Sequence, residues 1–415
     1  MTEPNRGTFV VETPPGGDRG PAPAPVSARG PGFDVPSGLR PLSSLDPDAI
    51  LMLEGQPDPG LAPLEALGKA YQRALQRHGA ELLAYGEPMG QSLLRREVAA
   101  WLSERRGLRV DIDQILITRG SRAAITLISL ALLKDGDEVA VEEPGNPQVR
   151  EAIRHGVQVR LRPIPVDGEG LDPAALEGPG APPRLVFLTP QHQFPTAAVL
   201  SGPRRRRLLD YAAAHRLALV EEDLDSEYAY GDHPVLPLAS QDTGGHVVYT
   251  TSLSRILAPG IRLGCIVAPA SLIDRFARVQ RNLEWQGDRA VEWAVADLMR
   301  DGELARHPRR SRKVYEARMH CLLDLVRRDL EEVLEASPCE GGLSLWARIR
   351  PEVPAREWID ACRIRGVALR PPSHFFLGEP RPCTLIGFAQ HAEARLAQAT
   401  ARMKQALEDV TTRAR

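Results

Sequence analysis

The sequence predicts an α/β protein whose mostly parallel sheet is covered by helices on both faces. Short runs of apolar and β-branched residues recur along the middle of the chain, and amphipathic stretches with a helical period separate several of them. That alternation is typical of parallel strands joined by crossover helices. The chain has 415 residues, 43% of them hydrophobic and 26% charged, which is the composition of a globular protein with a large core.

The predicted elements follow one another in a regular order. Apolar residues at helical spacing predict helices at 64–75, 93–105, 122–133 and 204–214. Strand-like runs occupy 114–117, 138–141, 157–161, 185–188, 217–220 and 247–249. Ligands of parallel sheets bind beyond the carboxyl ends of the strands. We therefore expect functional residues in the segments that directly follow these runs.

Four parts of the chain differ in composition. We predict a disordered tail rich in proline and glycine at 1–40, an N-terminal arm and helix at 41–75, a large α/β domain at 76–301 and a small α+β domain at 302–415. The tail is too short and irregular for a helix-turn-helix. The small domain combines a long charged helix with two strand-like runs and a closing helix, at 302–336, 343–349, 384–388 and 392–407.

Charge and cysteine content exclude several classes of function. The net charge of −2 gives no reason to expect nucleic-acid binding, and no apolar run approaches the length of a membrane-spanning helix. Five widely spaced cysteines without a CxxC pair indicate reduced thiols and a cytoplasmic protein. The acidic residues at 221–227 do not converge, because alternate strand residues face opposite ways, so no metal site is expected.

Six segments carry recognisable motifs in a fixed order. They are YGEPMG at 85–90, TRGS at 118–121, VEEPG at 141–145, TPQHQFPT at 189–196, EEDLDSE at 221–227 and SLSRILAPGIRLG at 252–264. Together they resemble the aminotransferase domain of the MocR-type proteins, within the fold-type I pyridoxal-phosphate family, over about residues 45 to 410. The resemblance implies the fold-type I transferase fold, with a large and a small domain, and a homodimer with the pocket at the subunit interface.

The same motifs suggest an anion cup. Gly120 and Ser121 end a strand and open a helix, where backbone N–H groups and the helix dipole favour an anion. The resemblance implies that Ser252, Ser254 and Arg262 complete a phosphate cup, with Tyr85 contributed by the partner subunit. The alternative is that Gly120 and Gly260 only serve ordinary turns.

Four further residues are placed near a cofactor ring by the resemblance: Asn146, His192, Gln193 and Glu222. The resemblance implies that the carboxylate at Glu222 holds the pyridine nitrogen protonated, which lets the ring accept electrons. The adjacent Asp223 is an alternative, because the register is uncertain by one residue. His192 is either a general base or a hydrogen-bonded loop residue.

The catalytic lysine of the family is missing. The resemblance places the Schiff-base lysine at Arg255, and a guanidinium cannot shed its proton to attack a carbonyl. The only lysines are Lys69, Lys134, Lys313 and Lys404, and none lies in a motif that reaches the site. Other departures are Leu224 for a tyrosine, Leu385 for the arginine that clamps the substrate carboxylate, and Ala197 for a glycine. We predict that no catalytic residue is retained.

Three functions remain open. The chain is a degenerate homologue that binds a small anionic ligand or a protein partner, an enzyme that holds pyridoxal or pyridoxamine phosphate noncovalently, or a dimeric scaffold. Arg255 either binds a ligand anion or forms a structural salt bridge with Glu222 or Asp223. We rank the noncatalytic binding role first, and we expect any pyridoxal phosphate that binds to be noncovalent.

Overall fold

The computed structural model describes residues 2–3, 7–8, 48–178, 180–231, 235–283 and 286–413. It divides into two compact units, Met1–Leu45 and Asp46–Arg415. In the first unit, the described residues form an antiparallel pair of two-residue strands, β1 (Thr2–Glu3) and β2 (Gly7–Thr8). The rest of the predicted disordered tail at 1–40 lies outside the described residues.

The second unit is built on an eight-stranded sheet with the order β4-β11-β10-β9-β8-β5-β6-β7. The strands are β4 (Ile115–Thr118), β5 (Glu138–Glu143), β6 (Arg160–Asp167), β7 (Gly170–Leu171), β8 (Leu185–Leu188), β9 (Ala218–Asp223), β10 (Val247–Thr251) and β11 (Gly264–Val267). Strands β6, β5, β8, β9 and β10 are mutually parallel, whereas β11 runs antiparallel to both β10 and β4. The predicted mostly parallel sheet is confirmed, and β11 is a strand that was not predicted.

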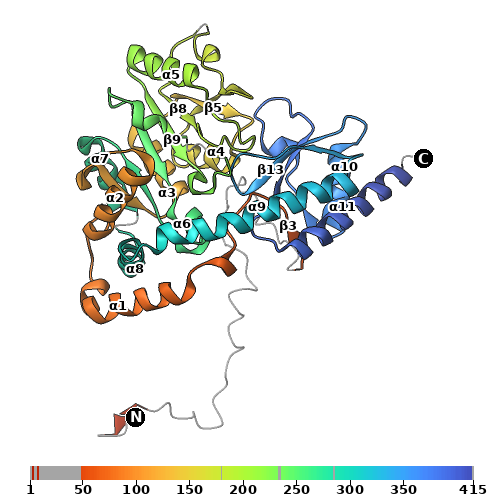
Figure 1. Cartoon of the computed structure of the whole chain (residues 1–415). Helices are drawn as coiled ribbons and strands as arrows, with labels where there is room; N and C mark the ends of the chain where they lie inside the picture. Colours follow the sequence, from red (N-terminus) through yellow and green to blue (C-terminus); the bar gives the residue numbers. More distant parts are fainter. Residues whose placement is uncertain are drawn as a thin grey trace, which may run out of the picture. The chain divides into compact units, whose positions relative to one another are not determined.

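Helices cover both faces of this sheet, as alternation along the strands requires (Figure 1). On one face, α3 (Ser121–Leu132), α4 (Pro147–Arg154) and α7 (Ala270–Leu283) pack on strand residues such as Leu116 and Val141. On the other face, the neighbouring residues Ile115 and Ala140 pack against different helices. These are α2 (Ser92–Arg106), α5 (Gly202–His215) and α8 (Arg289–Arg300).

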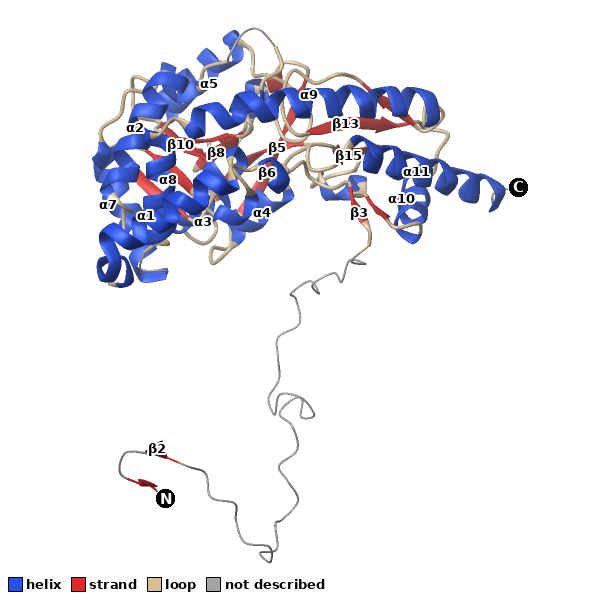
Figure 2. Ribbon diagram, turned by 60° about the horizontal axis from the view of Figure 1, so that its bottom comes forward, coloured by secondary structure: helices blue, strands red, loops and turns tan. Residues whose placement is uncertain are grey.

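A second core forms around a smaller antiparallel sheet. Its strands are β12 (Leu334–Ala336), β13 (Ser344–Ile349) and β15 (Cys383–Gly387), in the order β12-β13-β15. The helices α9 (Glu303–Asp329), α10 (Ala355–Ile364) and α11 (Glu393–Arg413) pack against it (Figure 2). Strand β3 (Ile50–Leu51) pairs in parallel with β14 (Val367–Ala368), so the arm before α1 joins this core. The predicted boundary between a large and a small domain stays a prediction.

The predicted N-terminal helices form with longer bounds. Helix α1 (Leu64–Leu83) extends well beyond the predicted end at 75 and is kinked at Gly79, which has a φ of 39°. Helix α2 ends at Gly107, whose left-handed conformation accounts for the glycine there. Within the described residues, no helix is long and apolar enough to cross a membrane, and no group of three or more metal-ligating side chains is placed to hold an ion.

Candidate functional site

The residues predicted to bind a ligand, with the exception of Tyr85, lie at the carboxyl edge of the eight-stranded sheet. Gly120 and Ser121 follow β4, Glu222 is near the end of β9, and Ser252 follows β10. Asn146 follows β5, whereas His192 and Gln193 follow β8. Because β4, β5, β8, β9 and β10 all run in one direction, the sheet brings these segments to a single edge.

The start of α3 has the geometry of an anion site. Gly120 has a φ of 83°, a conformation that L side chains rarely adopt, and it precedes the first residue of the helix. The guanidinium of Arg262 lies against Gly120, and its Nη2 donates to the Arg119 carbonyl at 2.8 Å. Arg262 is exposed. A positive side chain and the positive end of a helix dipole therefore lie together.

The two serines after β10 are held by the backbone. Ser254 Oγ accepts from the Leu263 N–H at 2.8 Å and donates to the Leu263 carbonyl at 3.1 Å. Ser252 Oγ lies 3.5 Å from the same carbonyl. Both hydroxyls thus tie α6 (Leu253–Ile256) to the segment before β11. Their role in binding phosphate stays a prediction.

The acidic residues of β9 point to opposite faces of the sheet. Asp223 Oδ2 accepts from Arg106 Nε at 2.8 Å and from the Tyr249 hydroxyl at 2.6 Å, on the face covered by α2. Glu222 instead hydrogen-bonds to Ser121 at the start of α3. The structure therefore places Glu222, and not Asp223, on the candidate ligand side.

Glu222 is almost completely buried, with 3% of its surface exposed. Burial raises the pKa of this carboxyl to about 7, although the Ser121 hydrogen bond and the nearby charge of Arg255 act in the opposite direction. Its Oε2 atom has no hydrogen-bond partner among the described residues. Near neutral pH the group can therefore either accept a hydrogen bond from a ligand or donate one to it.

Arg255 is held by all three of its guanidinium nitrogens. Nε and Nη2 donate to Oδ1 and Oδ2 of Asp225, at 2.8 and 2.5 Å, and Nη1 donates to the Gly55 carbonyl at 2.5 Å. Asp225 has a φ of 56°. Burial acts to lower the pKa of Arg255, but the charge and hydrogen bonds of Asp225 raise it overall. The expected partners, Glu222 or Asp223, are wrong, because neither bonds to Arg255.

All four lysines lie on the surface of the described chain. Lys69 pairs with Glu65 within α1, and Lys134, Lys313 and Lys404 are likewise exposed. Arg255 lies near enough to Glu222 for its charge to act on the pKa of that carboxyl. Its place at the position of the family's Schiff-base lysine stays a prediction.

The loop residues after β5 and β8 have structural partners. Asn146 caps α4, because its Oδ1 accepts from the Gln148 N–H at 3.0 Å. The amide of Gln193 bonds to the Pro144 and Phe194 carbonyls and to Thr196. For His192, burial lowers the pKa, and its Nδ1 has no partner among the described residues. A hydrogen bond with the Leu224 backbone agrees with the loop-residue alternative, and the unpartnered Nδ1 keeps the general-base alternative open.

An apolar cluster surrounds Leu385, at the position where the resemblance implies a carboxylate-binding arginine. Leu385 is fully buried and lies opposite Trp346 across β13 and β15. Phe375, Phe376 and Cys383 complete the buried cluster, and Phe194 packs against it. The rings of Trp346 and Phe375 meet edge to face at 5.1 Å. These aromatic residues were not predicted from the sequence, although the pair at 375–376 is a visible signal.

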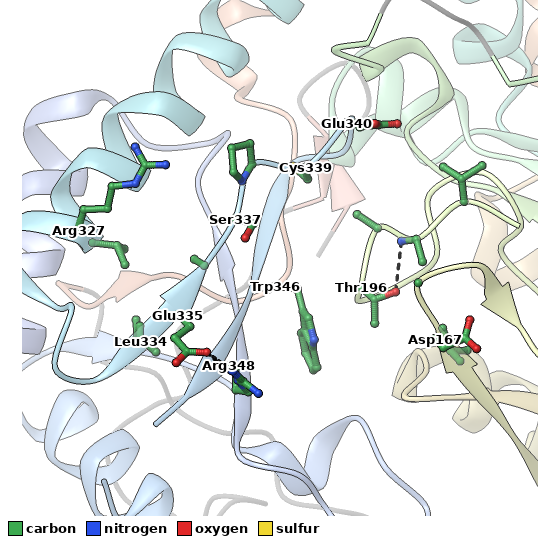
Figure 3. A pocket seen from close by; sticks show the side chains of 18 of the residues that line it. Asp167, Thr196, Arg327, Leu334, Glu335, Ser337, Cys339, Glu340, Trp346 and Arg348 are labelled. Carbon is green, nitrogen blue, oxygen red and sulfur yellow. Dashed lines mark hydrogen bonds and ion pairs between the residues drawn. The ribbon is translucent and has the colours of Figure 1, made fainter. Parts of the chain in front are cut away.

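Beside this cluster lies an open cleft of about 860 Å³ (Figure 3). Trp346 and Thr196 line it, together with Arg348, which forms an ion pair with Glu335. The cleft is bounded by the 196–199 loop on one side and by β12, β13 and the end of α9 on the other.

Tyr85 does not join the other predicted residues within one chain. It follows α1, is 80% exposed, and lines a separate cavity of about 380 Å³ with Gln286 and Arg289. A contribution of Tyr85 to a partner subunit stays a prediction.

Comparisons with known proteins cover almost the whole second unit. The model of the family "Aminotransferase class I and II" matches residues 47–403. The chain is 30% identical to a probable rhizopine catabolism regulatory protein MocR of Rhizobium meliloti, over 92% of this chain and 78% of that protein. It is 26% identical to aromatic-amino-acid aminotransferase 1 of Thermococcus litoralis, over 87% and 88%. A similar solved structure is that of LysN, the α-aminoadipate aminotransferase of Thermus thermophilus, complexed with N-(5'-phosphopyridoxyl)-L-leucine. The match covers 88% of this chain and 94% of the LysN chain, with a TM-score of 0.81 and 25% sequence identity.

Proposed function

Because the chain belongs to the class I and II aminotransferase family, we propose that it keeps the family fold, lacks the covalent cofactor chemistry, and acts by binding a ligand or a partner. The observation that carries this proposal is the state of Arg255. Its guanidinium is fully engaged by Asp225 and by the Gly55 carbonyl, and it has no accessible neutral form. Covalent catalysis requires an amine that can lose a proton at this position.

A covalently bound pyridoxal phosphate does not fit the residues present. The start of α3, Arg262 and the unpartnered oxygen of Glu222 suit the phosphate and the pyridine nitrogen. None of the four lysines belongs to the segments that form this site, since Lys69 lies in α1, Lys134 precedes β5 at the other edge of the sheet, Lys313 lies in α9 and Lys404 lies in α11. The site is therefore matched to a ligand that is held by charge and hydrogen bonds alone.

Two further features support a noncatalytic role. The Leu385 cluster is apolar and Leu385 itself is fully buried, so this position offers no charge to a substrate carboxylate. Leu224 stands where the resemblance implies a tyrosine at the cofactor phenolate, and only 9% of its surface is exposed. Loss of the lysine, the clamp and the phenolate partner together leaves the family chemistry without its main groups.

A noncovalent enzyme is the second candidate, favoured by His192. Its buried Nδ1 lacks a partner among the described residues, and burial lowers its pKa, which favours a neutral ring that can accept a proton. In this case pyridoxal or pyridoxamine phosphate would supply the electron sink, while Glu222 and the α3 start would hold and orient it.

A turnover assay separates the two candidates. We expect the wild-type protein, mixed with excess pyridoxal phosphate and a panel of amino acids, to convert no cofactor to the pyridoxamine form. Spectrophotometry of the cofactor and chromatography of the products measure this. Conversion that is lost in His192→Gln but retained in the exposed control His320→Gln would overturn the noncatalytic proposal and favour the second candidate.

We further propose that the protein is a homodimer that uses the face around α1. Large apolar side chains are exposed there, with Leu64 at 65%, Leu83 at 85% and Tyr85 at 80%. Leu75, at 51%, lies between the two leucines on α1, and exposed apolar side chains along one helix support a protein–protein contact there.

Sedimentation velocity tests the dimer. We expect a dimer at micromolar concentration, and we expect Leu83→Asp to shift the protein to a folded monomer, because the substitution places a charge in the apolar face. Ile364→Asp is the matched control, since Ile364 is 72% exposed on α10 and should leave the dimer intact. A wild-type protein that is a stable folded monomer at this concentration contradicts the proposal.

A further inference from the structure

A basic cleft lies at the opposite edge of the eight-stranded sheet from the candidate site. It has a volume of about 770 Å³ and is lined at the amino ends of β5, β6, β8 and β9. Its charged lining includes Arg160, Arg162, Arg184 and Arg216, with His215 beside them. Four guanidinium groups therefore line one concave surface of a protein whose net charge is −2.

The strand register brings these arginines together. Arg160 pairs with Glu138 across β6 and β5, and the Arg184 N–H donates to the Glu138 carbonyl at 2.7 Å. Leu185 is opposite Ala218 in β8 and β9, so Arg184 lies close to the segment that contains Arg216. Neighbouring strands are ~4.8 Å apart. The cluster is thus a consequence of the sheet and does not depend on flexible loops alone.

The acidic residues in the cleft are already engaged. Glu138 lies 3.7 Å from Arg162, which also donates to the Ala175 carbonyl, and Asp137 accepts from the Lys134 N–H. In contrast, the side chains of Arg160 and Arg216 have no acceptor among the described residues, and both are exposed. Four arginines against Asp137 and Glu138 leave the cleft lining a net charge of +2 with His215 neutral, and Arg160 and Arg216 form no ion pair within the described chain.

We propose that this cleft binds a small molecule that carries two or more phosphate groups. A guanidinium presents a planar pair of donors that matches a phosphate, and a pair of uncompensated guanidinium groups matches two phosphates. The volume lies within the range of small-molecule pockets. A duplex nucleic acid fits less well, because the arginines line a hollow and do not form a stripe along a convex surface. Binding at this edge is independent of Arg255 and of the proposed noncatalytic role.

Isothermal titration calorimetry with inorganic tripolyphosphate tests the proposal on the full chain. We expect saturable one-to-one binding to the wild-type protein and at least tenfold weaker binding to the double variant Arg160→Ala/Arg216→Asn. Asparagine is chosen at 216 because that residue has a φ of 53°, which asparagine adopts readily. The control Arg309→Ala/Arg356→Ala removes the same charge from exposed sites elsewhere and should bind within twofold of wild type.

Circular dichroism and thermal melts check that both double variants are folded. If the Arg160/Arg216 variant does not fold, the single variant Arg160→Ala replaces it, and we expect that variant to bind tripolyphosphate several-fold more weakly than wild type. Absence of binding to the wild type at millimolar tripolyphosphate overturns the proposal, as does an equal loss in the control variant. Tighter binding of a short DNA duplex than of tripolyphosphate, lost in the Arg160/Arg216 variant, would assign the cleft to nucleic acid and overturn it too.

Discussion

Replacing Arg106 with methionine is expected to lower the free energy of unfolding by about 3–5 kcal/mol, because it strands a buried charge. The side chains of Arg106 and Asp223 are 4% and 0% exposed, and Arg106 Nε lies 2.8 Å from Asp223 Oδ2. Arg106 also donates to Gln191 and to the Val235 carbonyl. Without it, Asp223 keeps only the Tyr249 hydroxyl as a side-chain partner among the described residues. This pair anchors the end of β9, from which Glu222 faces the candidate site.

Urea unfolding followed by circular dichroism measures the loss. The matched control is Arg207→Met, which breaks an ion pair with Glu177 whose side chains are 49% and 43% exposed. Solvent screens that pair, so we expect only a small part of the loss caused by Arg106→Met. Equal losses in the two variants would show that burial of the Arg106–Asp223 pair does not govern its contribution.

The second large effect concerns the pH dependence of stability. Burial raises the pKa of Glu222 in the folded protein to about 7, from 4.5 in the unfolded chain. The stabilisation from a protonated Glu222 is fully present below pH 4.5 and is lost as the pH rises through 7, because the unfolded chain releases the proton more readily. Glu222→Gln cannot ionise. Relative to wild type, it should therefore gain about 2–3 kcal/mol between pH 5 and pH 8.

Urea unfolding of both proteins at the two pH values measures the difference, and other titrating groups cancel because they are common to both. Glu352→Gln is the control, since Glu352 is exposed in the turn after β13 and should show no change in its effect with pH. A Glu222→Gln effect that is the same at pH 5 and pH 8 would mean that Glu222 is ionised in the folded protein throughout this range.

The sheet was predictable because several of its strands, such as β4, β8 and β10, are buried on both faces. Continuous apolar runs such as 185–188 coincide with β8. Strand β6 continues to Asp167, beyond the predicted end at 161, and Pro163 and Pro165 interrupt the strand pattern in the part that was missed. Strand β11 was missed because its four residues directly follow a loop motif. Each strand was predicted from its run of apolar residues. Where that run was short or interrupted, the predicted bounds were wrong or the strand was missed.

The partners of Arg255 could not be predicted from spacing. Asp225 turns its carboxylate toward Arg255 through a left-handed backbone conformation, which strand alternation does not anticipate. The Gly55 carbonyl comes from the arm, 200 residues away in the sequence. Motifs identify which residue types meet at the sheet edge, but the choice between neighbouring acids depends on backbone geometry and long-range packing.

Reductive trapping tests most directly whether the family chemistry has been lost. The wild-type protein is incubated with pyridoxal phosphate, reduced with borohydride, digested and mapped by mass spectrometry, with Arg255→Lys treated in parallel. We predict no stoichiometric cofactor adduct on the wild type at Lys69, Lys134, Lys313 or Lys404, because these side chains are exposed on the surface and none lies in a motif that reaches the site. A saturable, one-to-one adduct on one of these four lysines in the wild-type protein would contradict the account.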